Sequence, residues 1–521
     1  MGVGHKHPET HRVSGKAPGL SGADLAQTAA IWRLDTTTPI SAQTVGLAAP
    51  SFADPFAGGY TLGGLLPSGF AATPATAGAT RLTDDNSDIA LGGPTARSEF
   101  NVTGAGIKVG ILSDSFNLTG GMAADEANGN LPASVQILQE GSSGHDEGRA
   151  MADLVHKVAP GASIAFYSAT GGENSFAAGI AALQNAGCNV IVDDVAYLNE
   201  PFYQDGGVVQ QAVENAVADG VSYFTAASNE GTNYVEQSFA PMMLAPQGLP
   251  GGVVVQNFGT QAAPQPWTDV TLAKGATIEL DMQWDQPFAS IGSGSGGGAS
   301  DSIGMALYNS AGQIVAITSG DEVGNDPVQT LTYTNSASSS DFRLVVFANG
   351  GPSEPGMFKI INYGNGTINN DAGTGSGTVI GHELVPGANT VGAVAYANTT
   401  AFGGDNSVEG FSSVGTGQIL LNAAGQMLAA PESTGKVNFV APDGSMTSVF
   451  APFYGTSAAA PDAAAVAALM LQADPELTPG QVTQLLEQSA EPTTGPAMSG
   501  GAGLIQAPAA VQLALNLFHH S

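Results

Sequence analysis

The sequence predicts an α/β fold, a doubly wound and mostly parallel sheet that is interrupted by an inserted antiparallel β-sandwich. From about residue 106 to 230, short apolar segments alternate at close spacing with segments of helical period. Strands buried on both faces and joined by helices are typical of parallel sheets, whose ligands bind at the carboxyl ends of the strands. Near residue 250 the apolar period changes to two, and near residue 376 the first pattern returns.

The first part of the α/β domain, residues 96–250, alternates strands and helices in chain order. Cys188, the single cysteine, lies between a helix and a strand, where a small core residue is expected, and it excludes a disulfide framework or a thiolate zinc cluster. Strands are predicted at 107–114, 162–169, 189–195 and 222–228, and helices within 147–162, closed by Pro160 and Gly161, and at 174–187 and 208–220.

The insert is predicted at residues 251–375 as an antiparallel β-sandwich. Its clearest strand places Ile278, Leu280, Met282 and Trp284 at alternating positions, so these side chains share one face. Further segments with strand character follow, separated by Gly/Ser-rich connections. This pattern is typical of strands with one face in a core.

The second part of the α/β domain, residues 376–515, contains a strand at 389–397 and a long Ala-rich helix at 457–472. A further helix is expected after Thr478, because Thr478 can cap it and Gln481 completes a capping box. The two parts therefore form one fold that the insert interrupts.

The remaining segment, residues 1–95, is rich in Gly, Ala, Pro and Thr and is predicted to be a leader or a weakly structured extension. Its first residues have no apolar core of the signal-peptide kind. The whole chain has a formal net charge of −32, which makes nucleic acid an unsuitable partner. No apolar run is long enough to span a bilayer, so no membrane partner is expected.

The strongest motif is YGTSAAAP at residues 454–461, which places Ser457 at the opening of a helix. The positive end of a helix stabilises an alkoxide or an acyl intermediate on such a serine. An N-cap serine on a buried helix is the structural alternative. A second motif, TAASNEG, places Asn229 at the end of an apolar strand. A side-chain amide there can donate to a tetrahedral oxyanion, although an asparagine before Gly231 can also simply form a turn.

These motifs, together with NTVGAVA, FSSVG and GIKVGILSDS, resemble those of the subtilisin-like serine peptidases over residues 100–240 and 380–510. The resemblance implies that Ser457 is the nucleophile and Asn229 the oxyanion-hole donor. It also assigns the triad aspartate to Asp114, although a match without gaps places Ser113 there. Calcium is implied by the resemblance alone, and no other cofactor is indicated.

The sequence departs from that family where the catalytic histidine is expected. The segment GHDEGRAM aligns Glu147 with that histidine, and the related sedolisins use a glutamate at this place. Sedolisins support it with an acidic residue four positions later, where this chain has Met151, and replace the oxyanion asparagine by aspartate. His145, two residues before Glu147, is the competing general base.

A carboxylate base is ionised at mildly acidic pH, so an acidic optimum is expected if Glu147 is the base. A neighbouring carboxyl group can share a proton with it. Asp114 is expected to orient Glu147, and Asp146, Asp193 and Asp194 are the other candidate partners.

Three functions remain open from the sequence. The first is a serine endopeptidase that acts on proteins or peptides through Ser457 and Glu147, outside the cytoplasm or in the periplasm. The second is a degenerate homologue that binds peptides or carbohydrate, and the third is a hydrolase that uses His145. The sequence does not predict the oligomeric state.

Overall fold

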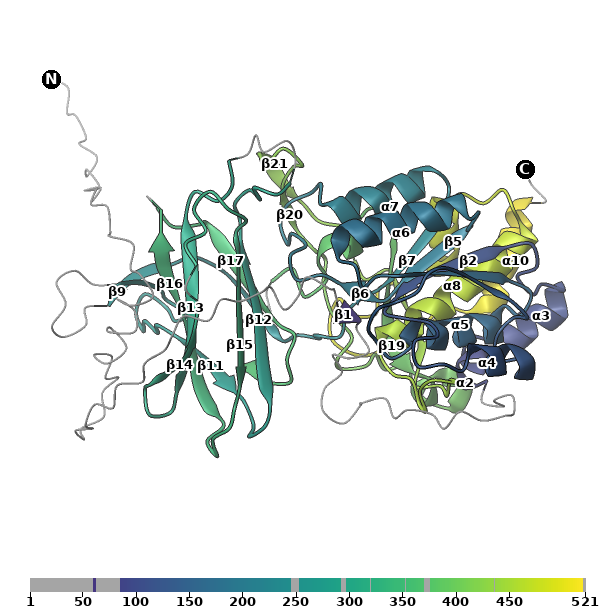
Figure 1. Cartoon of the computed structure of the whole chain (residues 1–521), viewed down its shortest axis with the longest axis horizontal. Coiled ribbons are helices and arrows are strands. Elements are labelled where there is room, and N and C mark those ends of the chain that lie inside the picture. Colours follow the sequence, from purple (N-terminus) through teal and green to yellow (C-terminus); the bar gives the residue numbers. More distant parts are fainter. Residues whose placement is uncertain are drawn as a thin grey trace, which may run out of the picture.

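The computed structural model shows two bodies side by side, an α/β body and an antiparallel β body (Figure 1). The residues that it describes are 60–61, 85–244, 253–291, 297–318, 320–351, 353–369, 375–434 and 436–518. The predicted leader therefore lies outside the described residues except at 60–61 and from residue 85 onward.

A parallel sheet of seven strands forms the centre of the α/β body, as the sequence predicts. The strand order is β22-β19-β7-β5-β2-β4-β3, and each neighbouring pair is parallel. The strands are β2 (Lys108–Ser113), β3 (Val135–Gln139), β4 (Ser163–Ser168), β5 (Val190–Asp193), β7 (Ser222–Ala226), β19 (Asn389–Ala395) and β22 (Phe439–Asp443).

Helices cover both faces of this sheet, because neighbouring residues of each strand point to opposite sides. Ile111 contributes to the core beneath α5 and α8, whereas Leu112 packs with α6, α7 and the buried Cys188. The helices of the first face are α3 (Gly93–Phe100), α5 (Glu147–Val158), α8 (Thr456–Ala473), α9 (Pro479–Ser489) and α10 (Ala507–Phe518); the second face has α6 (Glu173–Asn185) and α7 (Val208–Ala218).

The smaller elements of the α/β body lie around this core. Before α9, the Thr478 hydroxyl accepts a hydrogen bond from the Gln481 amide, so the expected capping box is present. The other elements are α2 (Asn86–Ala90), α4 (Met122–Asn128), β6 (Val195–Ala196), η2 (Gly381–Leu384), η3 (Tyr396–Asn398), η4 (Thr400–Phe402), β20 (Ile419–Leu421) and β21 (Met427–Glu432). None of the helices in the described part of the chain combines the length and apolar content that a bilayer crossing requires.

The β body is a sandwich of two antiparallel sheets around a core that contains Ile278, Leu280, Met282 and Trp284, the alternating residues noted in the sequence. One sheet has the order β15-β12-β17-β8. The other has the path β14-β13-β16-β10-β9, with β11 paired to β16 and β18. The strands are β8 (Tyr234–Ser238), β9 (Pro241–Leu244), β10 (Val253–Gln256), β11 (Thr268–Thr271), β12 (Thr277–Trp284), β13 (Ser302–Asn309), β14 (Ile314–Ile317), β15 (Val328–Thr334), β16 (Asp341–Gly350), β17 (Met357–Asn362) and β18 (Thr367–Asn369).

The insert begins earlier than residue 251, the boundary expected from the sequence. β8 pairs with β17 and β9 pairs with β10, so residues from Tyr234 onward belong to the sandwich. The apolar period changes near residue 250, between β9 and β10 of one sheet. Such a change does not distinguish a connection within a domain from a domain boundary.

The sandwich is docked directly on the α/β body. Gln283 lies on the second face of β12, and its amide donates to the carbonyl oxygens of Leu198 (3.1 Å) and Glu200 (2.9 Å). Its carbonyl oxygen accepts from the Phe202 amide at 2.9 Å. These contacts follow β6 in the chain, so they hold the insert beside the carboxyl edge of the parallel sheet, where ligands of such folds bind.

Candidate active site

Ser457 lies in the first turn of α8, the position that the motif predicts. Gly455 precedes this turn with φ 107°, a left-handed conformation that favours glycine, and its amide donates to Asp443 Oδ2 at 2.8 Å. Ser457 is buried, and its Oγ makes no hydrogen bond to any described residue. A hydroxyl at the amino end of an 18-residue helix lies in the favourable field for a developing negative charge.

Asn229 is held directly against the residue before the nucleophile. Its Oδ1 accepts hydrogen bonds from the backbone amide and the hydroxyl of Thr456, each at 3.1 Å. Because both bonds use the carbonyl end, the Nδ2 end of the side chain is the one that can donate to a substrate. The structure therefore brings together the serine and the asparagine of two motifs that are far apart in the sequence.

Ser228, the residue before Asn229, is held by hydrogen bonds of its own. Ser228 has φ 68°, a left-handed conformation that is uncommon for serine. Its carbonyl accepts from Thr456 Oγ1 and from the Ser413 amide, both at 3.2 Å. Its hydroxyl donates to Glu383 Oε1 at 2.5 Å, and burial raises the pKa of Glu383 to about 8. Glu383 therefore helps to fix the loop that carries the oxyanion-hole candidate.

Glu147 is the first residue of α5, and α5 packs against α8 on the same face of the sheet (Figure 1). Helices that connect parallel strands begin at the carboxyl edge of the sheet, so Glu147 and Ser457 both lie at that edge. The Glu147 side chain is buried, at 3% exposure. A carboxyl group thus occupies the place that the motif assigns to a histidine.

Asp114 follows β2 and holds the beginning of α5. Its carboxylate accepts from the backbone amides of His145 (2.7 Å), Glu147 (2.9 Å) and Ser115. Burial raises the pKa of Asp114, although these three hydrogen bonds act in the opposite direction. Asp114 orients Glu147 through its backbone.

Asp194 directly follows β5 and lies within electrostatic range of Glu147 and Asp114. β2 and β5 pair in the register Leu112–Asp193, so Ser113 and Asp194 follow at the same level of the sheet. Burial raises the pKa of Asp194 well above its usual value, and the negative charges of Glu147 and Asp114 add to the effect. The Ser113 hydroxyl partly offsets it. The site therefore contains a cluster of buried carboxyl groups, in which the pKa of Asp194 is raised well above its usual value.

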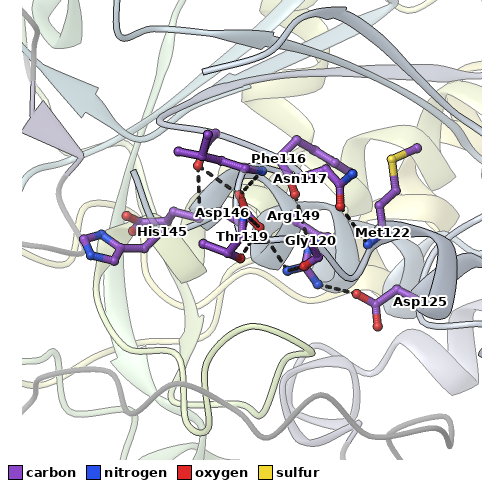
Figure 2. A network of polar contacts seen from close by, with 12 residues as sticks. Phe116, Asn117, Thr119, Gly120, Met122, Asp125, His145, Asp146 and Arg149 are labelled. Atoms are coloured by element: carbon purple, nitrogen blue, oxygen red, sulfur yellow. Dashed lines mark hydrogen bonds and ion pairs between the residues drawn. The ribbon is translucent and has the colours of Figure 1, made fainter. Parts of the chain in front are cut away.

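Asp146 is fully committed to a structural network (Figure 2). It has φ 61°, and its carboxylate accepts from the Leu118 amide at 2.7 Å, from Thr119 and from Arg149 at 3.1 Å. Burial would raise the pKa of Asp146, but hydrogen bonds from Thr119 and Arg149 and the charge of Arg149 lower it. The His145 imidazole is exposed and points away from this network in Figure 2.

A buried histidine network, which the sequence analysis did not identify, lies behind Asp194. His382 Nδ1 contacts Glu200 Oε1 at 2.8 Å, and its Nε2 contacts Asp193 Oδ1 at 3.2 Å. Burial alone would lower the pKa of His382, but the carboxylates of Glu200 and Asp193 raise it well above its usual value. The adjacent residues His382 and Glu383 were the only local signal, because the partners Glu200 and Asp193 lie more than 180 positions earlier in the chain.

A nucleophile-type serine at a helix start, an adjacent amide donor and a buried carboxyl cluster define the site of a serine hydrolase on a doubly wound fold. A family model described as the subtilase family matches residues 118–504, well over half of the chain. The chain therefore belongs to the subtilase family of serine peptidases.

Individual relatives are more distant. An extracellular protease of Xanthomonas campestris pv. campestris is similar to this chain, with 30% identity over 223 residues. The match covers 42% of this chain and 34% of the relative, so it spans about a third of that protein's length.

Two solved structures show distant likenesses. The CspB protease of Clostridium perfringens has a TM-score of 0.48 and 15% identity, covering 83% of this chain and 98% of that one. Fervidolysin of Fervidobacterium pennivorans has a TM-score of 0.38 and 16% identity, covering 85% of this chain and 50% of that one. The family assignment rests on the family model.

The calcium implied by the family resemblance was compared with the side chains present. In the described ranges, no group of three or more His, Cys, Asp or Glu residues is arranged to hold a metal ion.

Proposed function

We propose that this protein is a serine endopeptidase in which Ser457 is the nucleophile, Asn229 stabilises the oxyanion and Glu147 is the general base. The observation that carries this proposal is the contact between the two motifs, in which Thr456 binds Asn229 Oδ1 through its amide and its hydroxyl. This contact places an amide donor beside the residue that follows Thr456. A serine that served only as a helix cap would not require it.

In the proposed reaction, Ser457 Oγ attacks the scissile carbonyl while its proton passes to Glu147. Asn229 Nδ2 donates to the oxygen that becomes negative, an interaction worth about 3 kcal/mol in such enzymes. Glu147 then gives the proton to the leaving amine, and a water molecule hydrolyses the acyl-enzyme by the reverse path. Asp114 keeps Glu147 in place by accepting its backbone amide.

Asp194 is the partner that we propose for Glu147 within the carboxyl cluster. Because the pKa of Asp194 is raised by burial and by the charge of Glu147, the pair holds one proton, and Asp194 carries it. Ionised Glu147 then acts as the base at mildly acidic pH. Activity is expected to fall at low pH as Glu147 gains a proton and at high pH as Asp194 loses its own.

A peptide substrate is supported by a strand pairing next to Asp194. β1 (Tyr60–Thr61) pairs antiparallel with β6, with Tyr60 opposite Ala196 and Thr61 opposite Val195. The short strand β6, directly after Asp194, thus pairs with an extended backbone. Addition of a strand to an open edge is a common mode of peptide recognition.

The test is cleavage of a mixed, internally quenched peptide library between about pH 3 and pH 8. The full chain and a chain that begins at residue 85 would be compared with the variants Ser457→Ala, Glu147→Gln, Asp194→Asn and His145→Gln. We expect an acidic optimum, loss of cleavage in Ser457→Ala and Glu147→Gln, and a shifted alkaline limb in Asp194→Asn. His145→Gln should behave like the parent.

Each contrary outcome identifies a different function. Cleavage that survives in Glu147→Gln but is lost in His145→Gln would assign the base to His145. The absence of cleavage from both forms of the parent at every pH would favour the degenerate homologue that binds peptides or carbohydrate.

We also propose that the protein acts outside the cytoplasm. The net charge of −32 and the similarity to a protease named as extracellular support this location. Fractionation of the source cells and their medium, followed by immunodetection of the chain, tests it. Recovery of the chain with the cytoplasmic fraction alone would contradict the proposal.

A further inference from the structure

A polar cavity lies against Asn229, on the side where the insert meets the α/β body. Its volume is about 470 Å³. The walls come from the loop after Asn229, from the β17–β18 connection of the insert and from the segment around Phe411. The lining residues are Asn229, Glu230, Thr232, Asn233, Asn362, Tyr363, Gly364, Asn365, Gly366, Thr367, Ile368, Glu409, Gly410 and Phe411.

The walls of this cavity are fixed by hydrogen bonds. Asn233 donates from Nδ2 to the Gly366 carbonyl at 2.8 Å and accepts at Oδ1 from the Ile368 amide at 2.9 Å. On the other side, the Gly231 amide donates to the Phe411 carbonyl at 2.7 Å. A Cβ at Gly231, which has φ 52°, would lie 2.5 Å from the Gly410 carbonyl oxygen, so only glycine allows this approach. The cavity is therefore preformed.

Two buried polar atoms in this lining have no hydrogen-bond partner among the described residues. Glu230 is 6% exposed and Tyr363 is 4% exposed, and the unpaired atoms are Glu230 Oε1 and Tyr363 Oη. The other oxygen of Glu230 accepts from Ser413 Oγ at 3.1 Å. Buried polar atoms are normally paired, so two such atoms in one cavity indicate a missing hydrogen-bonding group.

The charge of the cavity indicates what that group is. Glu409, which is half-buried, is a second carboxyl group in the lining, and the lining contains no Lys, Arg or His. Neither Glu230 nor Glu409 forms an ion pair with any residue in the described ranges. Carboxylates that lack a cation in a partly closed site favour a ligand that carries one.

We propose that this cavity is a substrate subsite for a lysine or arginine side chain, with Glu230 and Glu409 as its counter-charges. The proposal rests on the proposed peptidase function, because the cavity begins at the oxyanion-hole candidate. A peptide whose scissile carbonyl faces Asn229 reaches the cavity with a side chain close to the scissile bond. The ammonium or guanidinium group pairs with the carboxyl group of Glu230, and Glu409 neutralises it from the rim.

The first experiment compares cleavage of quenched peptides in which each position in turn is Lys, Arg, Gln or Met. We expect kcat/KM for the preferred position to be at least about ten-fold higher with Lys or Arg than with Gln or Met. Glu409→Gln and Glu230→Gln should each lower this ratio several-fold. Glu476→Gln, an exposed glutamate between α8 and α9, is the matched control and should leave the ratio unchanged.

The second experiment measures binding without cleavage, using Ser457→Ala and isothermal titration with the same peptides in buffers of different ionisation enthalpy. Burial raises the pKa of Glu230 to about 7. The groups around it are Ser413, Tyr363 and Glu383, none of which is cationic. A bound cation lowers the pKa of Glu230, so a lysine peptide should release roughly half a proton at pH 7, and the glutamine peptide should release none. Glu230→Gln should abolish the release.

Equal kcat/KM and equal affinity for the Lys and Gln peptides at every position would overturn the proposal. So would a lysine preference that persists unchanged in both Glu409→Gln and Glu230→Gln. If no peptide is cleaved but the lysine peptide binds to Ser457→Ala with proton release, the subsite stands and the peptidase function fails. If peptides are cleaved without a preference for Lys or Arg, the peptidase function stands and the subsite fails.

Discussion

The burial of Glu383 predicts how the stability of the protein depends on pH, whatever the substrate is. Replacement by glutamine keeps the shape of the side chain and an acceptor for Ser228 Oγ, but removes the ionisation. Burial raises the pKa of Glu383 from 4.5 to about 8, although the bond from Ser228 acts in the opposite direction. The folded protein therefore holds a proton on Glu383 at pH values where the unfolded chain has lost it.

The sign and size of the effect follow from proton linkage. A raised carboxyl pKa means that the folded state binds more protons than the unfolded state between about pH 4.5 and pH 8, so stability decreases as pH rises in this window. Integration between the two pKa values gives a loss of about 2.5 kcal/mol from pH 5 to pH 7, at ~1.4 kcal/mol per pKa unit. Glu383→Gln does not experience this loss.

The assay is thermal unfolding by circular dichroism at pH 5, 6 and 7, with Ser457→Ala in both proteins so that autolysis cannot interfere. The melting temperature of the parent should fall by about 2–3 °C relative to Glu383→Gln over this range. Ser228→Ala is the matched control, because it removes the hydrogen bond and keeps the carboxyl group. Melting curves of parent and Glu383→Gln that remain parallel across the three pH values would refute the reasoning.

Three further predictions concern other parts of the molecule. Asn229→Ala should lower kcat by about 10²–10³-fold with little change in KM, and a smaller loss in single-turnover assays would remove Asn229 from the oxyanion hole. Arg149→Met should cost about 3–5 kcal/mol in denaturant unfolding, because it leaves the buried carboxylates of Asp125 and Asp146 without their cation; an unchanged midpoint would contradict this. Leu280→Ala should destabilise the sandwich by about 2–5 kcal/mol through the cavity it creates, and hydrogen exchange should show the loss in the insert before the parallel sheet.

The fold was largely predictable because its strands and helices have clear periods. The face formed by Ile278, Leu280, Met282 and Trp284 in β12 is the core face of the sandwich. The opposite face was not predictable, since Gln283 is buried against another body and polar residues at alternating positions normally indicate solvent. A polar residue that contacts another body has the same sequence pattern as one that faces solvent, so the docking could not be predicted.

The candidate site was predictable for the residues that lie in short, recognisable sequence motifs. Ser457 and Asn229 lie in short motifs whose local structure, a helix start and a strand end, can be derived from the sequence. The support of these residues was not predictable, because Glu383 reaches Ser228 from 155 positions away in the chain. The same holds for the electrostatic effect of Glu147 on Asp194, because the position of Asp194 depends on the register of two parallel strands.

That register also accounts for the ambiguity at the end of β2. In a match without gaps, Ser113 occupies the place of the family's aspartate, and Asp194 lies at the same level of the adjacent strand. We propose an exchange of roles, in which Asp194, directly after β5, provides the carboxyl group near Glu147 that is expected from the end of β2. Asp114 is then free to bind the backbone at the start of α5.

The proposed carboxyl base and the proposed acidic working range are compatible with the titration of the buried acids in this protein. Burial raises the pKa of Glu173 and Glu230 to about 7 and that of Glu383 to about 8, so each of these groups is neutral in the folded state at mildly acidic pH. Their ionisation weakens the fold as pH rises, for the reason given for Glu383. Lys436 acts in the opposite direction only above pH 7, because burial lowers its pKa to about 7. These buried acids therefore favour the folded state most strongly in the acidic range that we propose for the enzyme.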